Sequence, residues 1–496
     1  MHEKRAAPGS TEHAQEPAAN GRIVIDPVTR IEGHAKITLR LDDAGTVDDA
    51  RFHVTEFRGF EDFCRGRPVF EMPSLTSRTC GICPVSHLLA SAKAGDAILA
   101  VVIPPSAVAQ RRLANLGQII QSHSLSYFHL SAPDLLMGMD ADPAQRNLFG
   151  LMASEPELAR RGIRLRKFGQ EVIAAVTGER IHGAWIVPGG VANPLSPEAC
   201  AAIAALVPEA KQAAADTITE FTELIGRFGR EIEVFGTFDS LFLGHCAADG
   251  RWEHYGGGLR VVDSAGDIVV DGLDPARYRE VIGEWGNADS YLKSPYWKPL
   301  ATPEDPTPGV YRVGPLARLN LCERFGVPLA DEALAGFRER AGGIARSSFY
   351  YHYARLIEVL ACVELIERAL GDPVLVGTHV RASAGINADH AVGASEAPRG
   401  TLFHDYTVDD DGLITAVNMV IATGQNNLAM NRTVLQIAQE FVRGADVTEG
   451  ALNRVEAGIR AFDPCLSCST HAFGQMPMFV QITDSSGAVI AEARRD

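Results

Sequence analysis

Apolar and polar positions along this chain follow two periods. In Ala35–Leu41 they alternate, and the turn residues Asp42–Gly45 come next, so the sequence predicts an antiparallel hairpin within residues 21–60. In five longer stretches apolar residues recur with the spacing of an amphipathic helix. This spacing predicts helices over residues 84–102, 106–130, 196–229, 345–371 and 425–443.

Three other stretches interrupt the helical pattern. Residues 235–325 are rich in Gly, Pro and aromatic residues, which predicts strands and loops. The turn Asp409–Gly412 lies in the middle of residues 401–422 and predicts a second hairpin, and Met476–Ala493 has hairpin character as well. We therefore predict a mainly α fold with small β-sheets (α+β), in which peripheral hairpins surround a core of long helices.

The same patterns suggest the domain organisation. We expect one large unit over residues 21–471, with a mostly helical body at residues 84–443. Residues 1–20 are rich in Ala, Glu, His, Pro and Gly and predict a disordered leader.

Composition narrows the class of protein. With 496 residues, 46% of them apolar, the chain is long enough to bury a large core. A net charge of −16 argues against an extended basic surface for nucleic acid. One short basic run predicts a solvated helix face, with a partner-docking patch as the alternative. It consists of Arg160, Arg161, Arg164, Arg166 and Lys167.

Two further features bear on location. No stretch approaches the roughly 18 apolar residues that span a bilayer, and the N-terminal region lacks the apolar core of a signal peptide. Five of the nine cysteines stand alone, which fits a reducing compartment better than a disulfide framework. We expect a cytoplasmic protein without a membrane span.

The chemistry of the chain lies in two Cys-x-x-Cys pairs, Cys80 with Cys83 and Cys465 with Cys468. Such pairs bring two thiolates together, and thiolates select transition metals over magnesium or calcium. Closing so long a loop costs about 3 kcal/mol more than closing a zinc-ribbon loop, which is small against the roughly 10 to 16 kcal/mol of zinc binding. Spacing alone therefore leaves structural zinc, disulfides and a catalytic metal open.

The surroundings of the pairs add two points. Pro84 suits a first helical turn, so the first pair would lie at a helix N-terminus, where the amides favour thiolate over thiol. The chain has no Gly-x-Gly-x-x-Gly or Walker motif for a nucleotide and no further cysteine cluster for an iron–sulfur centre. Electrons generated here would have to leave through another subunit.

The sequences around the cysteines resemble the signatures of the large, catalytic subunit of nickel–iron hydrogenases. Residues 77–87 (Ser-Arg-Thr-Cys-Gly-Ile-Cys-Pro-Val-Ser-His) carry the first signature and residues 463–471 (Asp-Pro-Cys-Leu-Ser-Cys-Ser-Thr-His) the second. The resemblance extends through nearly the whole chain, with Asp-Pro-Val-Thr-Arg-Ile-Glu-Gly-His at 26–34, Phe-Arg-Gly-Phe-Glu at 57–61 and Glu-Ala-Pro-Arg-Gly at 396–400. It implies the large-subunit fold of that family.

The resemblance also implies roles for the cysteines. All four would hold one nickel, and Cys83 and Cys468 would also bridge to an iron that carries two cyanides and one carbon monoxide. Cys80 and Cys465 would be terminal ligands. Cys465 would accept the proton from dihydrogen cleavage and pass it to Glu32, which by residue type alone would be an ordinary surface or helix-cap carboxylate.

Four residues are implied around the open side of the metals. Arg399 follows Pro398 and would polarise the substrate or hydrogen-bond a cyanide, with Asp463 as its carboxylate partner. Without its flanks, Arg399 would read as a surface salt-bridge residue. Thr423 is a candidate donor to the other cyanide, although Ala422 stands where the family usually has Pro.

The resemblance implies a second metal and a processing step. Glu61 and His471 match positions that bind a magnesium-type ion, and His87 would hydrogen-bond near the bridging sulfur. Family precursors are cut by a maturation endopeptidase after the position of His471, so residues 472–496 would be removed. Residues 180–190 resemble the part that faces the nearest cluster of the small subunit, with a buried structural loop as the alternative.

Residues 398–406 and 463–471 look most like the soluble bidirectional, NAD-coupled members. This implies that the partners are an iron–sulfur small subunit together with a diaphorase module that holds FMN, NAD and further iron–sulfur clusters. Coupling to deazaflavin or heterodisulfide-linked partners is the alternative within the class. Outside it stand a non-catalytic scaffold similar to the quinone-site subunit of complex I, whose relatives lack the four cysteines, and a zinc-stapled assembly protein.

Overall fold

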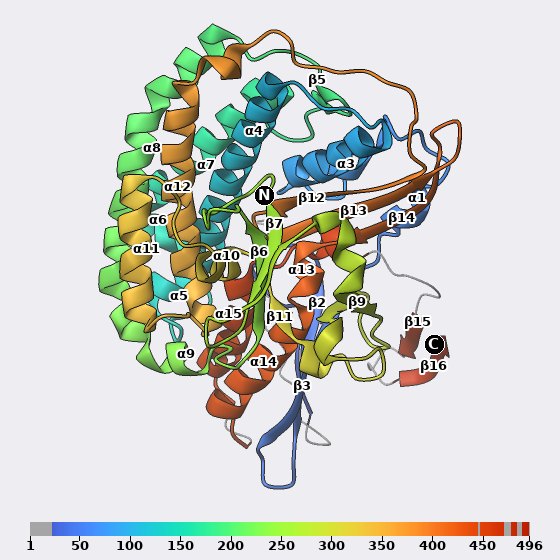
Figure 1. The fold of residues 1–496 in the computed structure, drawn as a ribbon. Coiled ribbons are helices and arrows are strands. Elements are labelled where there is room, and N and C mark those ends of the chain that lie inside the picture. Colours follow the sequence, from blue (N-terminus) through green and yellow to red (C-terminus); the bar gives the residue numbers. More distant parts are fainter. Residues whose placement is uncertain (1–21, 445–446, 471–477, 484–488, 496) are drawn as a thin grey trace, which may run out of the picture.

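The computed structural model describes residues 22–444 and 447–470, and the backbone of residues 478–483 and 489–495. The predicted leader and His471 lie outside these residues. Long helices pack side by side on the left of Figure 1, where α12 contacts both α4 and α8, and α7 contacts the same two helices. These helices are α4 (Pro105–Ser124), α7 (Pro156–Thr177), α8 (Pro197–Leu224), α11 (Pro328–Ala341) and α12 (Tyr351–Leu370).

The remaining helices lie outside this layer of packed helices and are mostly short. The α-helices are α1 (Phe60–Cys64), α2 (Met72–Ser77), α3 (Pro84–Ile98), α5 (Ala132–Met137), α6 (Leu148–Ser154), α9 (Gly229–Val234), α10 (Pro315–Leu321), α13 (Ala422–Gln425), α14 (Asn427–Phe441), α15 (Glu449–Phe462) and α16 (Leu466–Ser469). A π-helix, η1 (Leu125–Ser131), joins α4 to α5. The 3₁₀ helices are η2 (Ile225–Phe228), η3 (Pro275–Glu280), η4 (Lys298–Leu300), η5 (Thr307–Gly309), η6 (Ser348–Tyr350) and η7 (Pro373–Val376).

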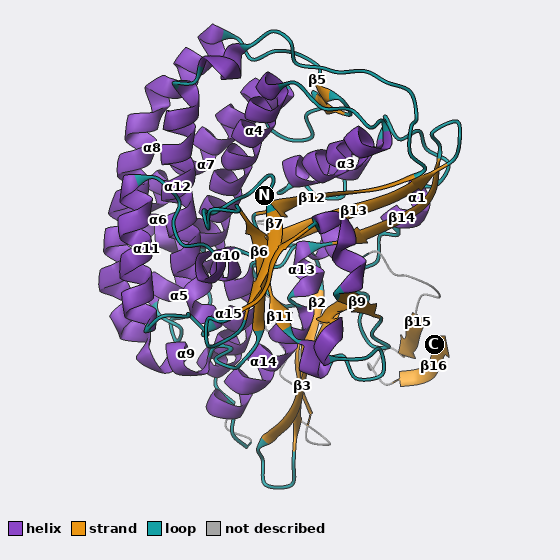
Figure 2. Ribbon diagram, viewed as in Figure 1, coloured by secondary structure: helices purple, strands orange, loops and turns teal. Residues whose placement is uncertain are grey.

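Small sheets lie beside the helices, and Figure 2 shows the strands gathered on one side of the helical layer. Two sheets are three-stranded and antiparallel: β1 (Arg22–Ile25), β2 (Ala35–Leu41) and β3 (Val47–Val54), and β12 (His390–Ala397), β13 (Gly400–Val408) and β14 (Ile414–Val420). A third has the order β11 (Tyr311–Arg312), β6 (Leu241–Cys246), β7 (Gly258–Val262) and β8 (Ile268–Leu273), with β11 parallel to β6. Two-stranded pairs are β4 (Ile186–Val187) with β5 (Gly190–Val191), β9 (Ile282–Trp285) with β10 (Ser294–Trp297), and β15 (Met478–Thr483) with β16 (Val489–Arg495).

The prediction of a mainly helical fold with small sheets is confirmed. Hairpins and strands also occupy the stretches where the sequence predicts them. Several element boundaries differ: α3 ends at Ile98, the helix that begins at Pro105 changes to the π-helix η1 after Ser124, α8 ends at Leu224, and α12 begins at Tyr351. The helices α7, α11 and α15 are not among those predicted. The division of the chain into leader, unit and removable tail stays a prediction.

Strand β12 is absent from the sequence-based expectations. Five of its eight residues are Ala, Gly or Ser, and it packs closely on α3: a Cβ at Gly393 would lie 1.9 Å from the carbonyl oxygen of Ala90. In register, Ala397 pairs with Gly400, so Pro398 and Arg399 form the two-residue turn between β12 and β13. This turn is what holds Arg399 in a fixed place.

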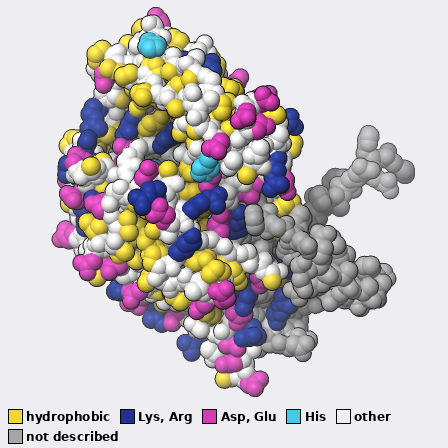
Figure 3. All heavy atoms as spheres, turned by 45° about the vertical axis from the view of Figure 1, so that its right-hand side comes forward, with side chains coloured by type: hydrophobic (Ala, Val, Ile, Leu, Met, Phe, Trp, Pro, Cys, Tyr) yellow, Lys and Arg dark blue, Asp and Glu magenta, His cyan; other side chains and the backbone are white. Residues whose placement is uncertain are grey.

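The surface agrees with the charge of the sequence. On the face in Figure 3, acidic and basic side chains are interspersed without a continuous basic area. In the basic run on α7, Arg160 and Lys167 are exposed, while Arg161 pairs with Glu220 of α8 at 2.7 Å. Of the helices in the described part of the chain, none combines the length and the apolar character that crossing a bilayer requires.

Candidate metal centre

The structure brings the two cysteine pairs together. Their Sγ atoms all lie within 4.8 Å of one another, and all four residues are buried. Cys80 Sγ is 3.2 Å from Cys465 Sγ, Cys83 Sγ is 3.5 Å from Cys468 Sγ, and Cys465 and Cys468 are 2.8 Å apart at sulfur. Two segments separated by most of the chain therefore form one four-sulfur pocket.

The first pair sits at the start of α3, with Pro84 in the first helical turn as predicted. The backbone N–H groups of Ile82 and Cys83 both donate to Cys80 Sγ at 3.2 Å. Such donors stabilise a thiolate, as a helix N-terminus does. Gln118 of α4 fixes this turn, since it accepts from the Val85 N–H at 3.1 Å and donates to the Ile82 carbonyl at 2.7 Å.

The second pair follows α15, which ends at Asp463 in a left-handed conformation (φ 55°) that turns the chain toward the pocket. The Cys465 N–H donates to Thr423 Oγ1 at 3.0 Å, and the Leu466 N–H donates to the Glu32 carbonyl at 3.1 Å. These two bonds seat the second pair between the N-terminal segment and α13.

Glu32 lies against the second pair through its side chain as well. Its Oε2 accepts from the Ser467 N–H at 3.1 Å, and the Ser467 hydroxyl donates to Oε1. Burial raises the pKa of the Glu32 carboxyl, and hydrogen bonds with the Cys465 side chain and the Ser467 amide oppose the rise. The structure thus places a carboxyl group in contact with the predicted terminal thiolate.

Arg399 reaches toward the pocket from its turn and pairs with Asp463. Its Nη2 lies 3.0 Å from both carboxylate oxygens, its Nε donates to the Asp463 carbonyl, and its Nη1 donates to Ser122 Oγ at 3.3 Å. Burial raises the pKa of Asp463, against the lowering effect of Arg399 and Arg355. Burial alone would lower the pKa of Arg399, but the Asp463 carboxylate and the cysteine sulfurs raise it. Arg399 therefore stays a cation beside the four sulfurs.

A buried network behind this turn has no counterpart in the sequence-based expectations. Arg318 donates to both oxygens of Glu358 at 2.6 Å, to Glu396 at 2.8 Å and to the Pro398 carbonyl at 3.1 Å. Glu358 also contacts His123 Nε2 at 2.8 Å. Glu396, inside the Glu-Ala-Pro-Arg-Gly motif, was the one available signal. The network holds the backbone that carries Arg399.

His87 and Thr423 both lie beside the cysteines. Hydrogen bonds with the other three cysteines lower the pKa of the Cys83 thiol against the effect of burial, and a hydrogen bond from His87 adds to the lowering. His87 Nδ1 lies 3.1 Å from His404 Nε2. Thr423 is buried, and its Oγ1 accepts from the Cys465 amide, which leaves its hydroxyl hydrogen to donate elsewhere.

Glu61, which the resemblance predicts to bind magnesium, is buried close to Lys293. Its Oε1 accepts from the Met419 N–H at 2.9 Å and lies 3.7 Å from Lys293 Nζ. Burial raises the pKa of Glu61 to about 7, and the Lys293 ammonium opposes the rise. The other half, His471, lies outside the described residues.

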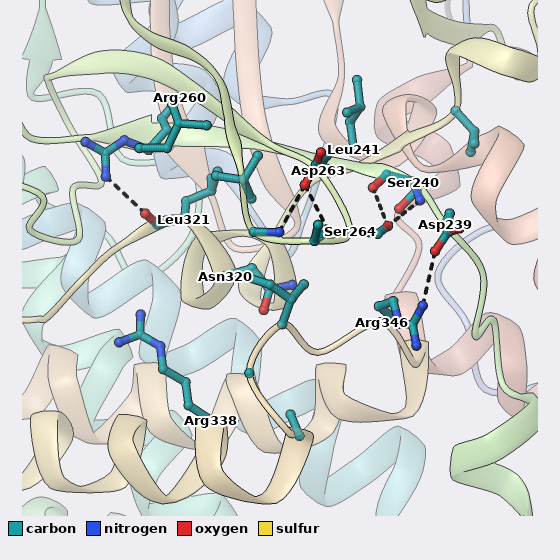
Figure 4. A pocket seen from close by; sticks show the side chains of 18 of the residues that line it. Asp239, Ser240, Leu241, Arg260, Asp263, Ser264, Asn320, Leu321, Arg338 and Arg346 are labelled. Atoms are coloured by element: carbon teal, nitrogen blue, oxygen red, sulfur yellow. Dashed lines mark hydrogen bonds and ion pairs between the residues drawn. The ribbon is translucent and has the colours of Figure 1, made fainter.

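Two other regions are set apart from the pocket. In the 180–190 segment Ile181 is 45% exposed, so its N-terminal part is not a buried loop, whereas Pro188 to Gly190 are buried. A hollow of about 1190 Å³ lies between the β7–β8 turn and the segment after α11, and Figure 4 shows Asp263, Ser264 and Arg346 around it. None of the predicted site residues lines this hollow.

The donor set tests whether a transition metal fits. The four groups are sulfurs, and the described residues contain no other cluster of possible metal ligands. Burial and the neighbouring sulfurs raise the pKa values of Cys465 and Cys468 well above the ordinary thiol value. Four thiolates are therefore compatible with this pocket only when a cation shares it, and sulfur donors select a soft or transition metal. Fold and site define the class: a mainly helical metalloprotein with a buried four-cysteine centre.

Comparison with known proteins identifies the family. Residues 22–57 match the family described as HoxL-like and residues 58–159 the family described as nickel-dependent hydrogenase. The chain is 41% identical to the NAD-reducing hydrogenase HoxS subunit beta of Cupriavidus necator, over 96% of this chain and 99% of that protein. It is also 41% identical to a vhu-type F420-non-reducing hydrogenase protein of Methanococcus voltae, over 84% and 98%.

Solved structures agree. A structure of an NAD+-reducing [NiFe]-hydrogenase in the H2-reduced state superimposes with a TM-score of 0.88 and 46% identity, over 92% of this chain and 100% of that chain. The Ni-Fe-Se hydrogenase of D. vulgaris Hildenborough gives a TM-score of 0.72 and 25% identity, over 91% and 99%. The chain belongs to the nickel-dependent hydrogenases and has the fold of their large subunit. Its four-cysteine pocket is accordingly a nickel–iron site rather than a structural zinc or disulfide site.

Proposed function

We propose that this chain is the catalytic subunit of an NAD-coupled hydrogenase that cleaves dihydrogen reversibly into protons and electrons. The carrying observation is the four-sulfur pocket with a carboxyl group on one side and a buried guanidinium–carboxylate pair on another. When bound, the nickel–iron group supplies heterolytic cleavage of dihydrogen and the redox steps. Two cyanides and one carbon monoxide would complete the ligands of the iron.

The four cysteines would divide the ligand positions. Cys83 and Cys468 would bridge both metals, and Cys80 and Cys465 would bind nickel alone. Two backbone amides donate to Cys80 Sγ. Cys465 is surrounded differently: its side chain is in hydrogen-bonding contact with Glu32. Cys465 Sγ would therefore take up the proton and hand it to a Glu32 carboxylate oxygen.

The other predicted residues would orient and shield the reacting atoms. Arg399, fixed by Asp463 and Ser122, offers a charge that cannot be lost and planar donors for a cyanide or for polarising the substrate. Thr423 would donate its hydroxyl to the second cyanide, and Pro398 would shape the turn beside it. Glu61, with His471, would bind magnesium.

Electrons must leave the chain, because its described residues hold no second cysteine cluster. An iron–sulfur small subunit would receive them and a diaphorase module with FMN would pass them to NAD, which the likeness to the HoxS subunit beta supports. The F420-non-reducing relatives keep a different acceptor open as a second candidate. We place the complex in the cytoplasm and assign removal of residues 472–496 to a maturation endopeptidase.

The test uses the purified hetero-oligomeric enzyme. Infrared bands of metal-bound cyanide and carbon monoxide are expected together with nickel, and iron should exceed nickel because the partner subunits carry iron–sulfur clusters. Zinc without these bands would contradict the proposal. Dihydrogen-dependent reduction of NAD, compared in the same preparation with reduction of deazaflavin, checks the carrier. Reduction of deazaflavin alone would replace the NAD assignment and leave the hydrogenase assignment intact.

A further inference from the structure

A buried ion cluster ties the segment before Glu32 to helix α15. Its centre is Asp134 of α5, which is 2% exposed. Three guanidinium groups contact this carboxylate: Arg30 contacts Oδ1, Arg460 donates to Oδ2 at 2.7 Å, and Arg146 Nε lies 3.2 Å from Oδ1. Burying so many charges is unfavourable unless each one is paired, so the cluster has one well-defined arrangement.

The cluster fixes the backbone of Thr29 and Arg30. Arg460 donates to the Thr29 carbonyl at 3.0 Å and to its hydroxyl at 3.1 Å, while Glu456 accepts from the Thr29 N–H at 2.6 Å. Arg30 donates to the Leu130 carbonyl at 2.6 Å. Arg30 also has a left-handed backbone (φ 56°), which a residue with a side chain adopts at a cost unless its surroundings enforce it.

This anchoring lies directly beside the proposed proton relay. Arg30 precedes Glu32 by two residues, and Arg460 lies in the last turn of α15, which leads into Cys465. At the far end Glu32 and Cys465 pair as a short β-bridge. Proton transfer requires donor and acceptor within about 2.6 to 3.2 Å, and a misplacement of about 1 Å can cost roughly 10²-fold in rate. The cluster sets the spacing of this pair from both sides.

We propose that Asp134, acting through Arg30 and Arg460, is a positioning residue for proton transfer between Cys465 and Glu32. The inference rests on the proposed function. The run from α4 through η1 to α5 then supports both sides of the site, because Ser122 on the same run contacts Arg399. The π-helix between them accords with this role, since such segments are frequent at functional sites.

The experiment compares Asp134→Asn and Thr29→Val in the purified complete enzyme with its partner subunits. Dihydrogen oxidation with an artificial dye is measured per nickel in H2O and in D2O, alongside the infrared bands of the iron ligands. We expect unchanged bands and a rate about 10²-fold lower for Asp134→Asn, with a loss of roughly 3- to 10-fold for the milder Thr29→Val. The solvent isotope effect rises in both, because proton transfer becomes rate-limiting.

The control is Asp140→Asn. Asp140 pairs at 2.6 Å with Arg454, which lies on α15 as Arg460 does, but the Asp140 side chain is 71% exposed. The rate and the isotope effect of Asp140→Asn should therefore match those of the unmodified enzyme. A purely structural role would lower nickel content or melting temperature without moving the per-nickel isotope effect, and that result would overturn the proposal. Should Asp134→Asn fail to assemble with nickel, Thr29→Val decides the question alone.

Glu32→Gln, measured in parallel, separates the positioning role from the relay itself. If Glu32→Gln keeps full turnover, the relay in the proposed function is wrong and the inference is overturned with it. If Glu32→Gln loses turnover while Thr29→Val and every assembled Asp134→Asn enzyme keep the original rate and isotope effect, only the positioning role is wrong.

Discussion

The two cysteine pairs perform the same metal-binding task in different surroundings. Around Cys80 and Cys83 the hydrogen bonds come mainly from backbone amides and from the neutral side chain of Gln118. Around Cys465 the neighbours include the Glu32 carboxyl group and the ion pair of Asp463 with Arg399. His87 is an ionisable neighbour of the first pair, and its ring is buried against His404. The ion pair of Asp463 with Arg399 also interacts electrostatically with Cys83.

This difference separates two functions of one pocket, metal binding and proton transfer. Holding nickel needs four thiolates from both ends of the chain, and each pair contributes equally. Moving a proton needs groups that change charge close to a sulfur, and the carboxyl groups gather at the second pair. The hollow in Figure 4 lies apart from this pocket, and neither the four cysteines nor Glu32, Arg399 or Asp463 line it.

The largest effect is expected from removing one ligand of either pair. Cys83→Ser and Cys465→Ser each replace a soft thiolate by a hydroxyl, so nickel content and dihydrogen oxidation should both fall to background. Metal analysis and a dye-reduction assay on the purified complex measure this. Cys200→Ser, on the half-exposed part of α8, is the control and should keep both. Nickel retained in either ligand variant would mean that the two pairs do not contribute equally to nickel binding.

The next effect should appear at the second pair only. Glu32→Gln keeps an acceptor for the Ser467 N–H at 3.1 Å but cannot take up a proton. Nickel content and infrared bands should stay unchanged while turnover drops by about 10²- to 10⁴-fold, the usual contribution of a positioned acid or base. Glu56→Gln, a nearby carboxylate that bonds to His34, is a matched control. Equal rates for both variants would remove Glu32 from the mechanism.

Much of this site was predictable because its motifs are made of residues that are close together in the sequence. Cys-x-x-Cys spacing, Pro84 at the helix start and the motif around Glu32 each lie within a few residues of the groups they position. Long-range pairings were not predictable. Arg318 meets Glu358 and Asp134 meets Arg460 across tens to hundreds of residues, and each alone reads as an ordinary charged side chain.

The same limit applies to the fold. Helical spacing identified α4, α8 and α12, because their apolar faces repeat over many turns, but it did not identify α7 or α11. It missed β12, whose small residues such as Gly393 are selected by contact with α3 rather than by strand preference. It also missed the change to a π-helix after Ser124, since nothing in a one-dimensional pattern distinguishes the two kinds of turn.

A smaller effect concerns pH and the predicted magnesium site. Burial raises the pKa of Glu61 to about 7, above its ordinary value of 4.5, so the folded protein holds the extra proton between these pH values. Stability should therefore fall as pH rises from about 4.5 to 7, by up to roughly 3 kcal/mol. Glu61→Gln should flatten this slope in thermal unfolding measured with a chelator present.

The same thermal unfolding measurement, repeated with magnesium, tests Glu61 as a magnesium ligand. A divalent cation favours the ionised carboxylate, so magnesium at pH 8 should raise the melting temperature of the unmodified protein and leave Glu61→Gln unchanged. Calcium at equal concentration serves as the control for ionic strength. An equal rise in both proteins would mean that Glu61 is not the ligand.

The smallest effect tests the comparison most directly, with one lost hydrogen bond at each pair. Gln118→Leu leaves the Val85 N–H without its acceptor, while Gln121 still donates to the Ile82 carbonyl, so the cost should be about 1 to 2 kcal/mol of stability. Turnover per nickel should not change, because no charged group moves. Thr423→Val removes the acceptor of the Cys465 N–H, at a similar cost in stability.

The rate of Thr423→Val should be lower than that of Gln118→Leu, because loss of this hydrogen bond lets the Cys465 sulfur shift relative to Glu32. Chemical denaturation gives the two stabilities, and dye reduction per nickel gives the two rates. Because Thr423 is also the proposed donor to a cyanide, the infrared bands are recorded too. Matched losses of stability, unshifted cyanide bands and a lower rate for Thr423→Val alone would show that the second pair is the proton-handling side. Equal rates in the two variants would mean that the carboxyl groups beside the second pair do not make it functionally distinct from the first.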